Sequence, residues 1–178
     1  MLVADQATGR IVALDEATGQ FLRVVTAVGL DLPSSLSWGP GGSLYATNFG
    51  AYAGPGSAAS VVKVDPDTGQ TTAFIDDIGG PGAVGYDPVH RGDSLFVSKL
   101  ADFVIVEGQP QADFSGNEVY QYDAAGERVA VIGAGSPTTG RSGIAFDGQG
   151  NLYVSEFAFF GVGSVLKYDG ADGFAPLG

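Results

Sequence analysis

Short stretches of alternating apolar and polar residues recur along this chain, separated by turns rich in glycine, aspartate or proline. In residues 61–65 (VVKVD) and 165–169 (VLKYD), a lysine stands between apolar neighbours. Such alternation is typical of a strand with one face buried and the other in water. Because the stretches are short and joined by tight turns, the pattern predicts an all-β chain of antiparallel strands.

The predicted strands form a repeated unit of two hairpins. Hairpins of the first kind occur at 35–48, 83–99 and 143–156. Hairpins of the second kind follow at 60–75, 117–132 and 163–178, with a partial copy at 9–25. Four strands in roughly 40–45 residues is the size of a propeller blade.

The turns of the second hairpin have a shared chemistry. An aspartate can accept hydrogen bonds from backbone amides two or three residues later, and a glycine supplies the positive φ that the turn needs. The pairs are Asp15 with Gly19, Asp65 with Gly69, Asp123 with Gly126 and Asp169 with Gly173. Much of the aspartate and glycine content is therefore turn material.

The whole chain, 1–178, is predicted to be a single β-propeller domain, either an incomplete propeller or part of a larger one. Its repeats cover approximately 1–30, 31–77, 78–134 and 135–178. Four antiparallel blades are expected, and the first lacks its innermost strand, which gives fifteen strands. The missing strand leaves an open position that another part of the protein or a second copy could complete.

Composition narrows the function classes. The formal net charge of −12 disfavours nucleic acid and anionic membrane surfaces as partners. The chain has no cysteine and one histidine, His90, so thiolate chemistry and a nucleophile–histidine triad of the usual kind are not expected. No apolar run is long enough for a membrane helix, and Met1 leads into LVAD without the pattern of a secretory signal peptide.

The repeats resemble the NHL-repeat and SMP-30 (gluconolactonase)-like β-propellers. The resemblance rests on GIAFDGQGNLYVSE at 143–156, GSVLKYDG at 163–170 and PSSLSWGPGGSLYATN at 33–48. It implies innermost strands that line a channel, and ligand binding at the rim where second and third strands connect. It also implies an exported bacterial protein, extracellular or periplasmic.

The resemblance places the ends of the second strands, Asp5, Asn48, Lys99 and Glu156, at one mouth of the channel. It implies a Ca²⁺ ion held by Asp5, Asn48 and Glu156, with Glu156 or Asp5 as the water-activating base of a lactone hydrolase. Lys99 departs from this pattern because an ammonium competes with the cation. The alternative is a polar plug in which Lys99 lies between Glu156 and Asn48.

Aromatic residues concentrate in three connections on the same rim, at 49–59, 100–116 and 157–162. They are Phe49, Tyr52, Phe103, Phe114, Phe157, Phe159 and Phe160. Apolar loops of this kind bury against the ring, against another protein or against a small apolar ligand. His90 lies in a predicted turn and is expected to be solvated, and Trp38 is expected to pack in the core.

Two functions remain open from the sequence. The first is a non-enzymatic propeller that binds another protein or self-associates into an oligomer or filament, with no required cofactor. The alternative is a metal-dependent, lactonase-like hydrolase with Ca²⁺ in the channel. The sequence alone does not choose between them.

Overall fold

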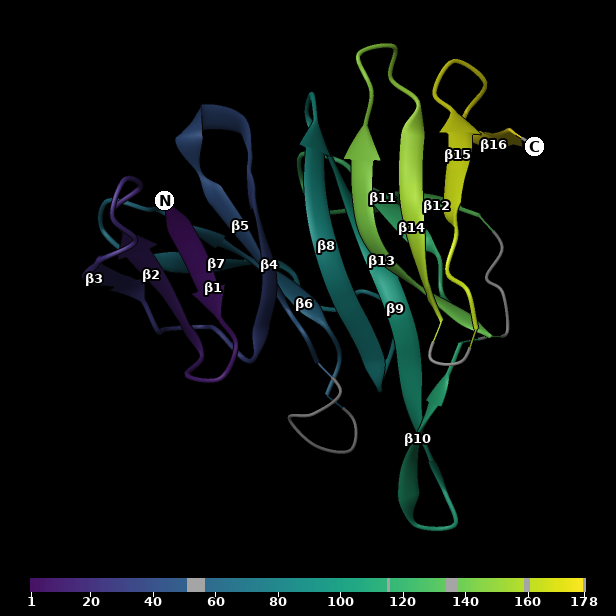
Figure 1. Cartoon of the computed structure of the whole chain (residues 1–178), viewed down its shortest axis with the longest axis horizontal. Coiled ribbons are helices and arrows are strands. Elements are labelled where there is room, and N and C mark those ends of the chain that lie inside the picture. The colour runs from purple at the N-terminus through teal and green to yellow at the C-terminus, as the bar shows by residue number, and fades with distance from the viewer. Residues whose placement is uncertain (51–56, 115, 134–137, 159–160, 178) are drawn as a thin grey trace.

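Four antiparallel sheets follow one another along the chain (Figure 1). The computed structural model describes residues 1–50, 57–114, 116–133, 138–158 and 161–177. The first sheet has the order β1-β2-β3, with β1 at Leu2–Asp5, β2 at Arg10–Leu14 and β3 at Phe21–Thr26. The second has the order β4-β5-β6-β7, with β4 at Pro33–Trp38, β5 at Leu44–Asn48, β6 at Ser60–Val64 and β7 at Thr71–Ile75. A short 3-10 turn, Pro40–Gly42, joins β4 to β5.

The third sheet contains β8 at Ala83–Arg91, β9 at Ser94–Val106, β10 at Gln109–Asp113, β11 at Val119–Tyr122 and β12 at Arg128–Ile132. The fourth has the order β13-β14-β15-β16, with β13 at Thr139–Phe146, β14 at Leu152–Ala158, β15 at Val165–Asp169 and β16 at Ala175–Leu177. The all-β, propeller-type prediction is thus confirmed, with sheets of three to five strands. Among the described residues, no helix is long and apolar enough to span a membrane.

The sheets pack side by side through their first strands. Strand β8 packs against β4 and β5, and β13 packs against β8 and β9. Strand β4 packs against β1 in the way that β8 packs against β5, so β1 occupies the place of a second strand. The first sheet therefore lacks its innermost strand, and in Figure 1 the first and last sheets lie at opposite ends of an arc.

Buried apolar clusters hold consecutive sheets together. Each cluster takes alternate residues from two neighbouring sheets, as expected for strands with one inward face. Successive junctions bury Ile11 with Leu44, Val61 with Leu95, and Phe96 with Leu152. In the last junction, the Phe96 ring meets the Phe146 ring edge-on with the centroids 4.8 Å apart, a favourable aromatic geometry.

The aspartate–glycine turns form as predicted. Asp15 Oδ1 accepts hydrogen bonds from the amides of Ala17 at 3.0 Å and Thr18 at 2.8 Å, and Gly19 has a φ of 70°. The equivalent Gly126 has a φ of 84° and also meets the preceding sheet: a Cβ there would lie 2.4 Å from the Phe74 carbonyl oxygen. This glycine thus allows both the turn and the close approach of two sheets.

Three local predictions are wrong. Residues 100–116 were expected to be a loop, but β9 continues to Val106 and pairs with β10, so the described residues form sixteen strands where fifteen were expected. His90 belongs to β8 and is half-buried, and its ring lies 4.3 Å from that of Tyr45 between centroids. Burial holds the pKa of His90 below its ordinary value. Trp38, expected in the core, is 57% exposed at the end of β4.

Candidate functional site

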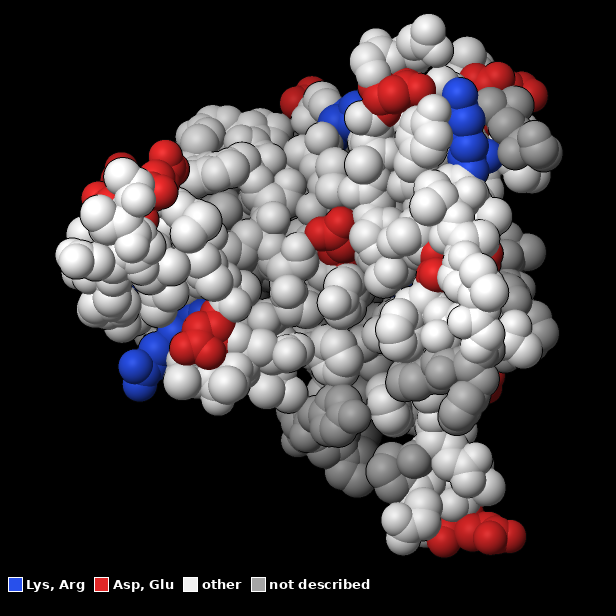
Figure 2. Space-filling view, in the orientation of Figure 1, with Lys and Arg blue, Asp and Glu red and all other residues white. Residues whose placement is uncertain are grey.

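One carboxylate on an innermost strand links three sheets. Asp87 on β8 accepts a hydrogen bond from Ser35 Oγ of β4 at 2.7 Å and another from the Ile144 amide of β13 at 3.0 Å. Ser98 Oγ accepts from the Asp87 amide at 3.0 Å and donates to the Ser142 carbonyl at 2.5 Å. Figure 2 shows an isolated acidic group over the middle of β8. Burial raises the pKa of Asp87, although both hydrogen bonds act in the opposite direction.

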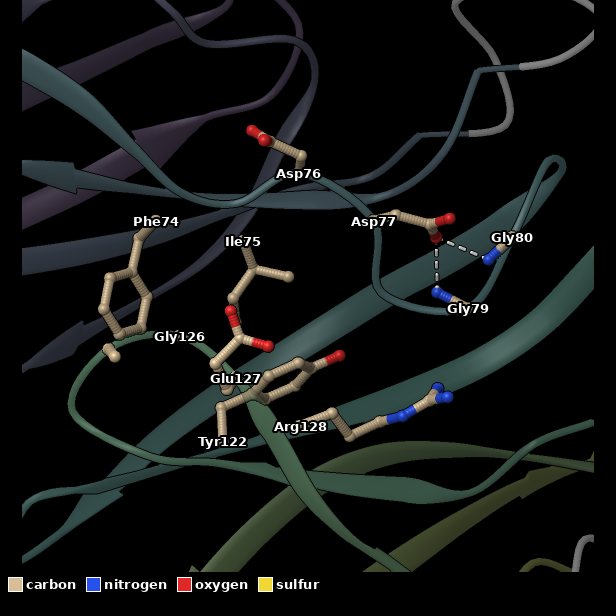
Figure 3. Close-up of a pocket in the computed structure, with 11 residues that line it drawn as sticks. Phe74, Ile75, Asp76, Asp77, Gly79, Gly80, Tyr122, Gly126, Glu127 and Arg128 are labelled. Atoms are coloured by element: carbon tan, nitrogen blue, oxygen red, sulfur yellow. Dashed lines mark hydrogen bonds between the residues drawn. The ribbon is translucent and has the colours of Figure 1, made fainter.

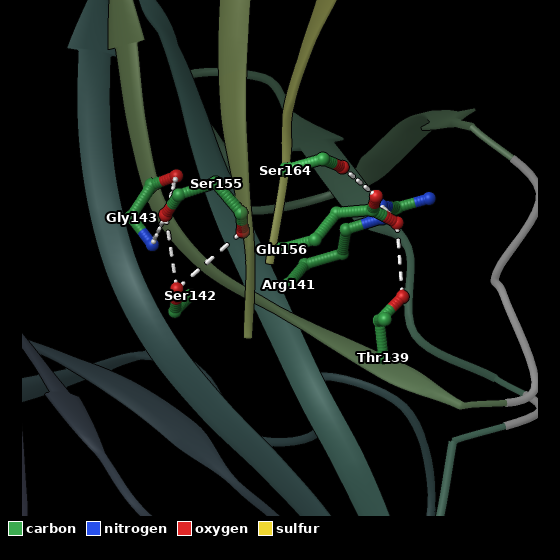
Figure 4. Close-up of polar contacts among 7 residues, drawn as sticks. All are labelled: Thr139, Arg141, Ser142, Gly143, Ser155, Glu156 and Ser164. Carbon is green, nitrogen blue, oxygen red and sulfur yellow. Dashed lines mark hydrogen bonds and ion pairs between the residues drawn. The ribbon is translucent and has the colours of Figure 1, made fainter. Parts of the chain in front are cut away.

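Serines continue this polar network along β13 and β14 (Figure 4). The Ser142 and Ser155 hydroxyl oxygens lie 2.9 Å apart. Ser155 Oγ also accepts from the Gly143 amide at 2.8 Å and donates to the Gly143 carbonyl at 3.1 Å. These serines satisfy backbone groups at a register shift between β13 and β14, so their hydroxyls act in the packing of the strands.

Glu156 is enclosed by donors from β13 and from the residue that precedes β15 (Figure 4). Its Oε1 accepts hydrogen bonds from Thr139 Oγ1 at 2.9 Å and from the guanidinium of Arg141, and its Oε2 accepts from Ser164 Oγ. The Arg141 side chain is only 3% exposed. Burial raises the pKa of Glu156, but the hydrogen bonds from Ser164, Thr139 and Arg141 outweigh it and hold the pKa below its usual value.

The other three predicted rim residues also have protein partners. Asn48 Oδ1 accepts from the Asp31 amide at 3.0 Å, and its Nδ2 donates to Ser60 Oγ at 3.0 Å. Lys99 is buried and pairs with Asp102, with 2.8 Å between Nζ and Oδ2. Asp5 is half-buried at the end of β1 and accepts hydrogen bonds from the amide and hydroxyl of Thr8, which lower its pKa.

These contacts do not fit a calcium ring as the resemblance implies it. The oxygens of Glu156 and Asn48 are engaged by protein donors, and Arg141 supplies the positive charge beside Glu156. Within the described part of the chain, no group of three or more His, Cys, Asp or Glu residues is placed to hold a metal ion. The metal ligands Asp5, Asn48 and Glu156 stay a prediction.

The rim carries an apolar projection that sequence reasoning missed. Strands β9 and β10 extend as a hairpin beyond the sheets, at the bottom of Figure 1. Val104, Ile105 and Val106 are 38%, 59% and 41% exposed there. The turn places Glu107 and Gly108 at positive φ, 52° and 76°. Such a turn usually carries Asn-Gly or Asp-Gly, so the Glu-Gly pair gave little sequence signal.

The predicted aromatic residues are dispersed along this rim. Phe49 is half-buried and lines a pocket of about 350 Å³ with Leu32, Ala7 and Gln6. Phe103 and Phe114 are half-buried at the base of the hairpin, and Phe157 is 44% exposed. Tyr52, Phe159 and Phe160 lie outside the described residues. The structure thus places an apolar pocket and an apolar hairpin on one rim.

Comparisons with known proteins agree with this architecture. No family model matches the sequence, and no curated protein matches it. Among solved structures, the chain is similar to a gluconolactonase from Xanthomonas campestris, with 16% identity and a TM-score of 0.66 over 94% of this chain and 53% of that one. It is also similar to the periplasmic gluconolactonase of Pseudomonas aeruginosa, with 18% identity and a TM-score of 0.58 over 99% and 52%. A GH43 endo-arabinanase from Bacillus licheniformis matches with 10% identity and a TM-score of 0.50 over 95% and 67%.

The similarity concerns the fold. Nearly the whole chain superposes on propellers of the gluconolactonase (SMP-30-like) type, whereas the identities are below 20%. The chain spans about half the length of the gluconolactonases that it matches. Because one propeller fold hosts many activities, the site residues have to be argued from their own contacts.

Proposed function

We propose that the protein is a non-enzymatic β-propeller module that self-associates through its rim. The observation that carries this proposal is the projecting β9–β10 hairpin with its exposed Val104, Ile105 and Val106. Successive residues of a strand point to opposite faces, so β9 presents apolar side chains on both faces of the hairpin, although Gln109 and Gln111 of β10 lie opposite Val106 and Val104. This exposed segment of the hairpin, Val104–Val106, is called the finger. Apolar side chains that project from two faces fit a concave partner better than they fit the flat face of their own sheet.

The same chain offers a pocket for this finger. Leu32, Phe49, Ala7 and Gln6 line it at the rim of the first two sheets, whereas the hairpin belongs to the third sheet. A contact between two different surfaces of identical copies is heterologous and generates a ring or an open filament. We therefore assign a second copy of this chain as the occupant of the pocket.

Charge supports the same pairing. Glu107 lies at the tip of the hairpin, and exposed Arg10 closes the turn that carries Gln6 and Ala7. In Figure 2, acidic atoms mark the tip of the hairpin, and basic atoms with acidic atoms next to them lie at the lower end of the first sheet. Opposite charges at the edges of an apolar contact steer association and fix its register.

The proposal includes a location outside the cytoplasm, extracellular or periplasmic, which rests on the resemblance to exported bacterial propellers. A non-enzymatic role is supported by the engagement of Glu156 and Asn48 with protein groups. Cell fractionation with an antibody tests the location: recovery of the mature chain only from the cytoplasm contradicts it.

Single variants test the contact. Ile105→Asp places a charge on the finger, and Ala7→Glu places one at the exposed mouth of the pocket, where it also repels Glu107. Light scattering after size exclusion should show wild-type species heavier than 18.1 kDa and monomers for both variants. The matched control is Val162→Asp on a neighbouring rim loop, since Val162 is 93% exposed. A monomeric wild type, or equal disruption by the control, overturns the proposal.

A further inference from the structure

A second hollow lies away from the rim contact, between the second and third sheets (Figure 3). It has a volume of about 520 Å³, within the usual range for small-molecule sites. Asp76 and Asp77 follow the end of β7 on one side, and Glu127 and Arg128 lie at the β11–β12 turn on the other. The two sides belong to different sheets, so the hollow exists only because the sheets pack together.

The charge of this hollow is unbalanced. Three carboxylates line it against one guanidinium, and the guanidinium of Arg128 lies 5.0 Å from the centroid of the Tyr120 ring. Asp77 Oδ1 accepts hydrogen bonds from the amides of Gly79 at 2.8 Å and Gly80 at 2.5 Å. Asp76 and Glu127 are exposed and have no side-chain hydrogen bond or ion pair to any described residue. An incoming cation would therefore meet carboxylates with free acceptor capacity.

A buried hydroxyl at the same place lacks a partner. Tyr122 is 2% exposed and lines the hollow, and its hydroxyl has no hydrogen bond within the described structure. Figure 3 shows this hydroxyl pointing between Asp77 and Arg128. Burial, with the nearby Asp77 charge, raises the pKa of Tyr122 to about 12, so the hydroxyl stays neutral near pH 7. An unpaired buried hydroxyl is costly, and a ligand group that bonds to it removes that cost.

The spacing of the acids distinguishes between kinds of cation. The described carboxylates here do not form a cluster of three that could hold a metal ion. A metal needs its oxygen ligands within bonding distance of one point, whereas a chain with several ammonium groups can reach separated carboxylates. Phe74 adds an aromatic wall against which methylene groups can pack.

We propose that this hollow binds an aliphatic di- or polyamine, with its ammonium groups on Asp76 and Glu127 and one end directed to the Tyr122 hydroxyl. This site is independent of the rim contact, because neither Val104–Val106 nor Phe49 lines it. A neutral polyol of similar length would leave the carboxylate charges unpaired and should bind much more weakly.

Spermidine is the probe, with hexane-1,6-diol as the uncharged control, both in isothermal calorimetry at fixed ionic strength. Saturable spermidine binding is expected, weakened about tenfold or more by Asp76→Asn with Glu127→Gln through loss of two charge contacts. The matched control is Asp172→Asn, an exposed acid in the β15–β16 turn. Absence of saturable binding, or equal weakening in the control, overturns the site and assigns the effect to the overall negative charge.

Tyr122→Phe supplies a separate readout. Without spermidine, this variant should melt no lower than wild type, because it removes an unpartnered buried hydroxyl and keeps the ring. With spermidine, its gain in melting temperature should be smaller than that of wild type. A full wild-type gain and unchanged affinity would contradict the proposed role of the hydroxyl.

Discussion

The hydroxyl of Ser35 on the second sheet donates a hydrogen bond to the carboxylate of Asp87 on the third sheet at 2.7 Å. The same carboxylate accepts from the Ile144 amide of the fourth sheet. Replacement by alanine leaves both donors without this acceptor, so Asp87→Ala should lower the free energy of unfolding by about 1–3 kcal/mol. Urea unfolding measures the loss, and an unchanged midpoint would show that Asp87 does not link the sheets energetically.

Asp87 also predicts a pH dependence. Its pKa is raised in the folded state, so the native protein binds the proton more tightly than the unfolded chain does. Protonated Asp87 therefore stabilises the native wild type relative to Asp87→Asn. This stabilisation is complete below the pKa of the unfolded state and is lost as the pH rises through the pKa of the folded state. Urea unfolding at several pH values between 3 and 7 should therefore show that the free energy of unfolding of wild type falls relative to that of Asp87→Asn as the pH rises. A difference that does not change with pH contradicts this assignment.

The Arg141–Glu156 pair predicts a large asymmetry between single and double variants. Glu156→Gln removes the carboxylate charge beside a guanidinium that is only 3% exposed and should lower the free energy of unfolding by about 3–5 kcal/mol. The combined Arg141→Met and Glu156→Leu change removes both charges and should recover most of that loss. If the double variant is as unstable as the sum of its single variants, the pair is not coupled as described.

Two glycines at equivalent turns form a matched comparison. A Cβ at position 19 would meet nothing within 4 Å. Gly19→Ala should therefore lower the free energy of unfolding by only about 1 kcal/mol, which is the cost of a positive φ for alanine. Gly126→Ala meets the Phe74 carbonyl oxygen as well, so the loss should reach about 2–4 kcal/mol. Thermal melts of the two variants distinguish the conformational cost from the cost of separating the sheets. Equal losses would show that the second and third sheets do not rely on this close approach.

The acidic turns predict loss of stability at low pH. The side chain of Asn151 and nearby amides hold the pKa of Asp147 at about 2. A lowered folded pKa gives stability above the unfolded value of 3.8 that is lost as the pH falls toward 2. Wild type should therefore lose stability more steeply than Asp147→Asn in this window, as measured by melting temperature. If the melting temperatures of wild type and Asp147→Asn fall in parallel as the pH falls, Asp147 does not have the lowered pKa assigned to it.

The sequence predicted the features that depend on neighbours along the chain. Asp15 and Gly19 lie in one turn, and their roles follow from local hydrogen bonds and φ. Contacts between sheets could not be predicted in this way: Ser35 and Asp87 are 52 residues apart, and the partner of Glu156 depends on the pairing of β13 with β14. The hairpin at Val104–Val106 was missed because its turn uses an uncommon residue pair.

The hollow at Tyr122 shows the same limit. Its two sides come from separate repeats, and neither repeat carries a recognisable ligand motif. The signal is the burial of a hydroxyl that has no partner among the described residues, and this depends on how the folded sheets pack. Tyr122 appears in the sequence as one more aromatic residue of an alternating strand.

The most direct test of head-to-tail association is the mass of a mixture. Ala7→Glu disables the pocket and keeps the finger, whereas Ile105→Asp disables the finger and keeps the pocket. Native mass spectrometry should show each variant alone as an 18.1 kDa monomer and their equimolar mixture as a 1:1 dimer that grows no further. A mixture that stays monomeric while wild type assembles would contradict the finger-in-pocket contact.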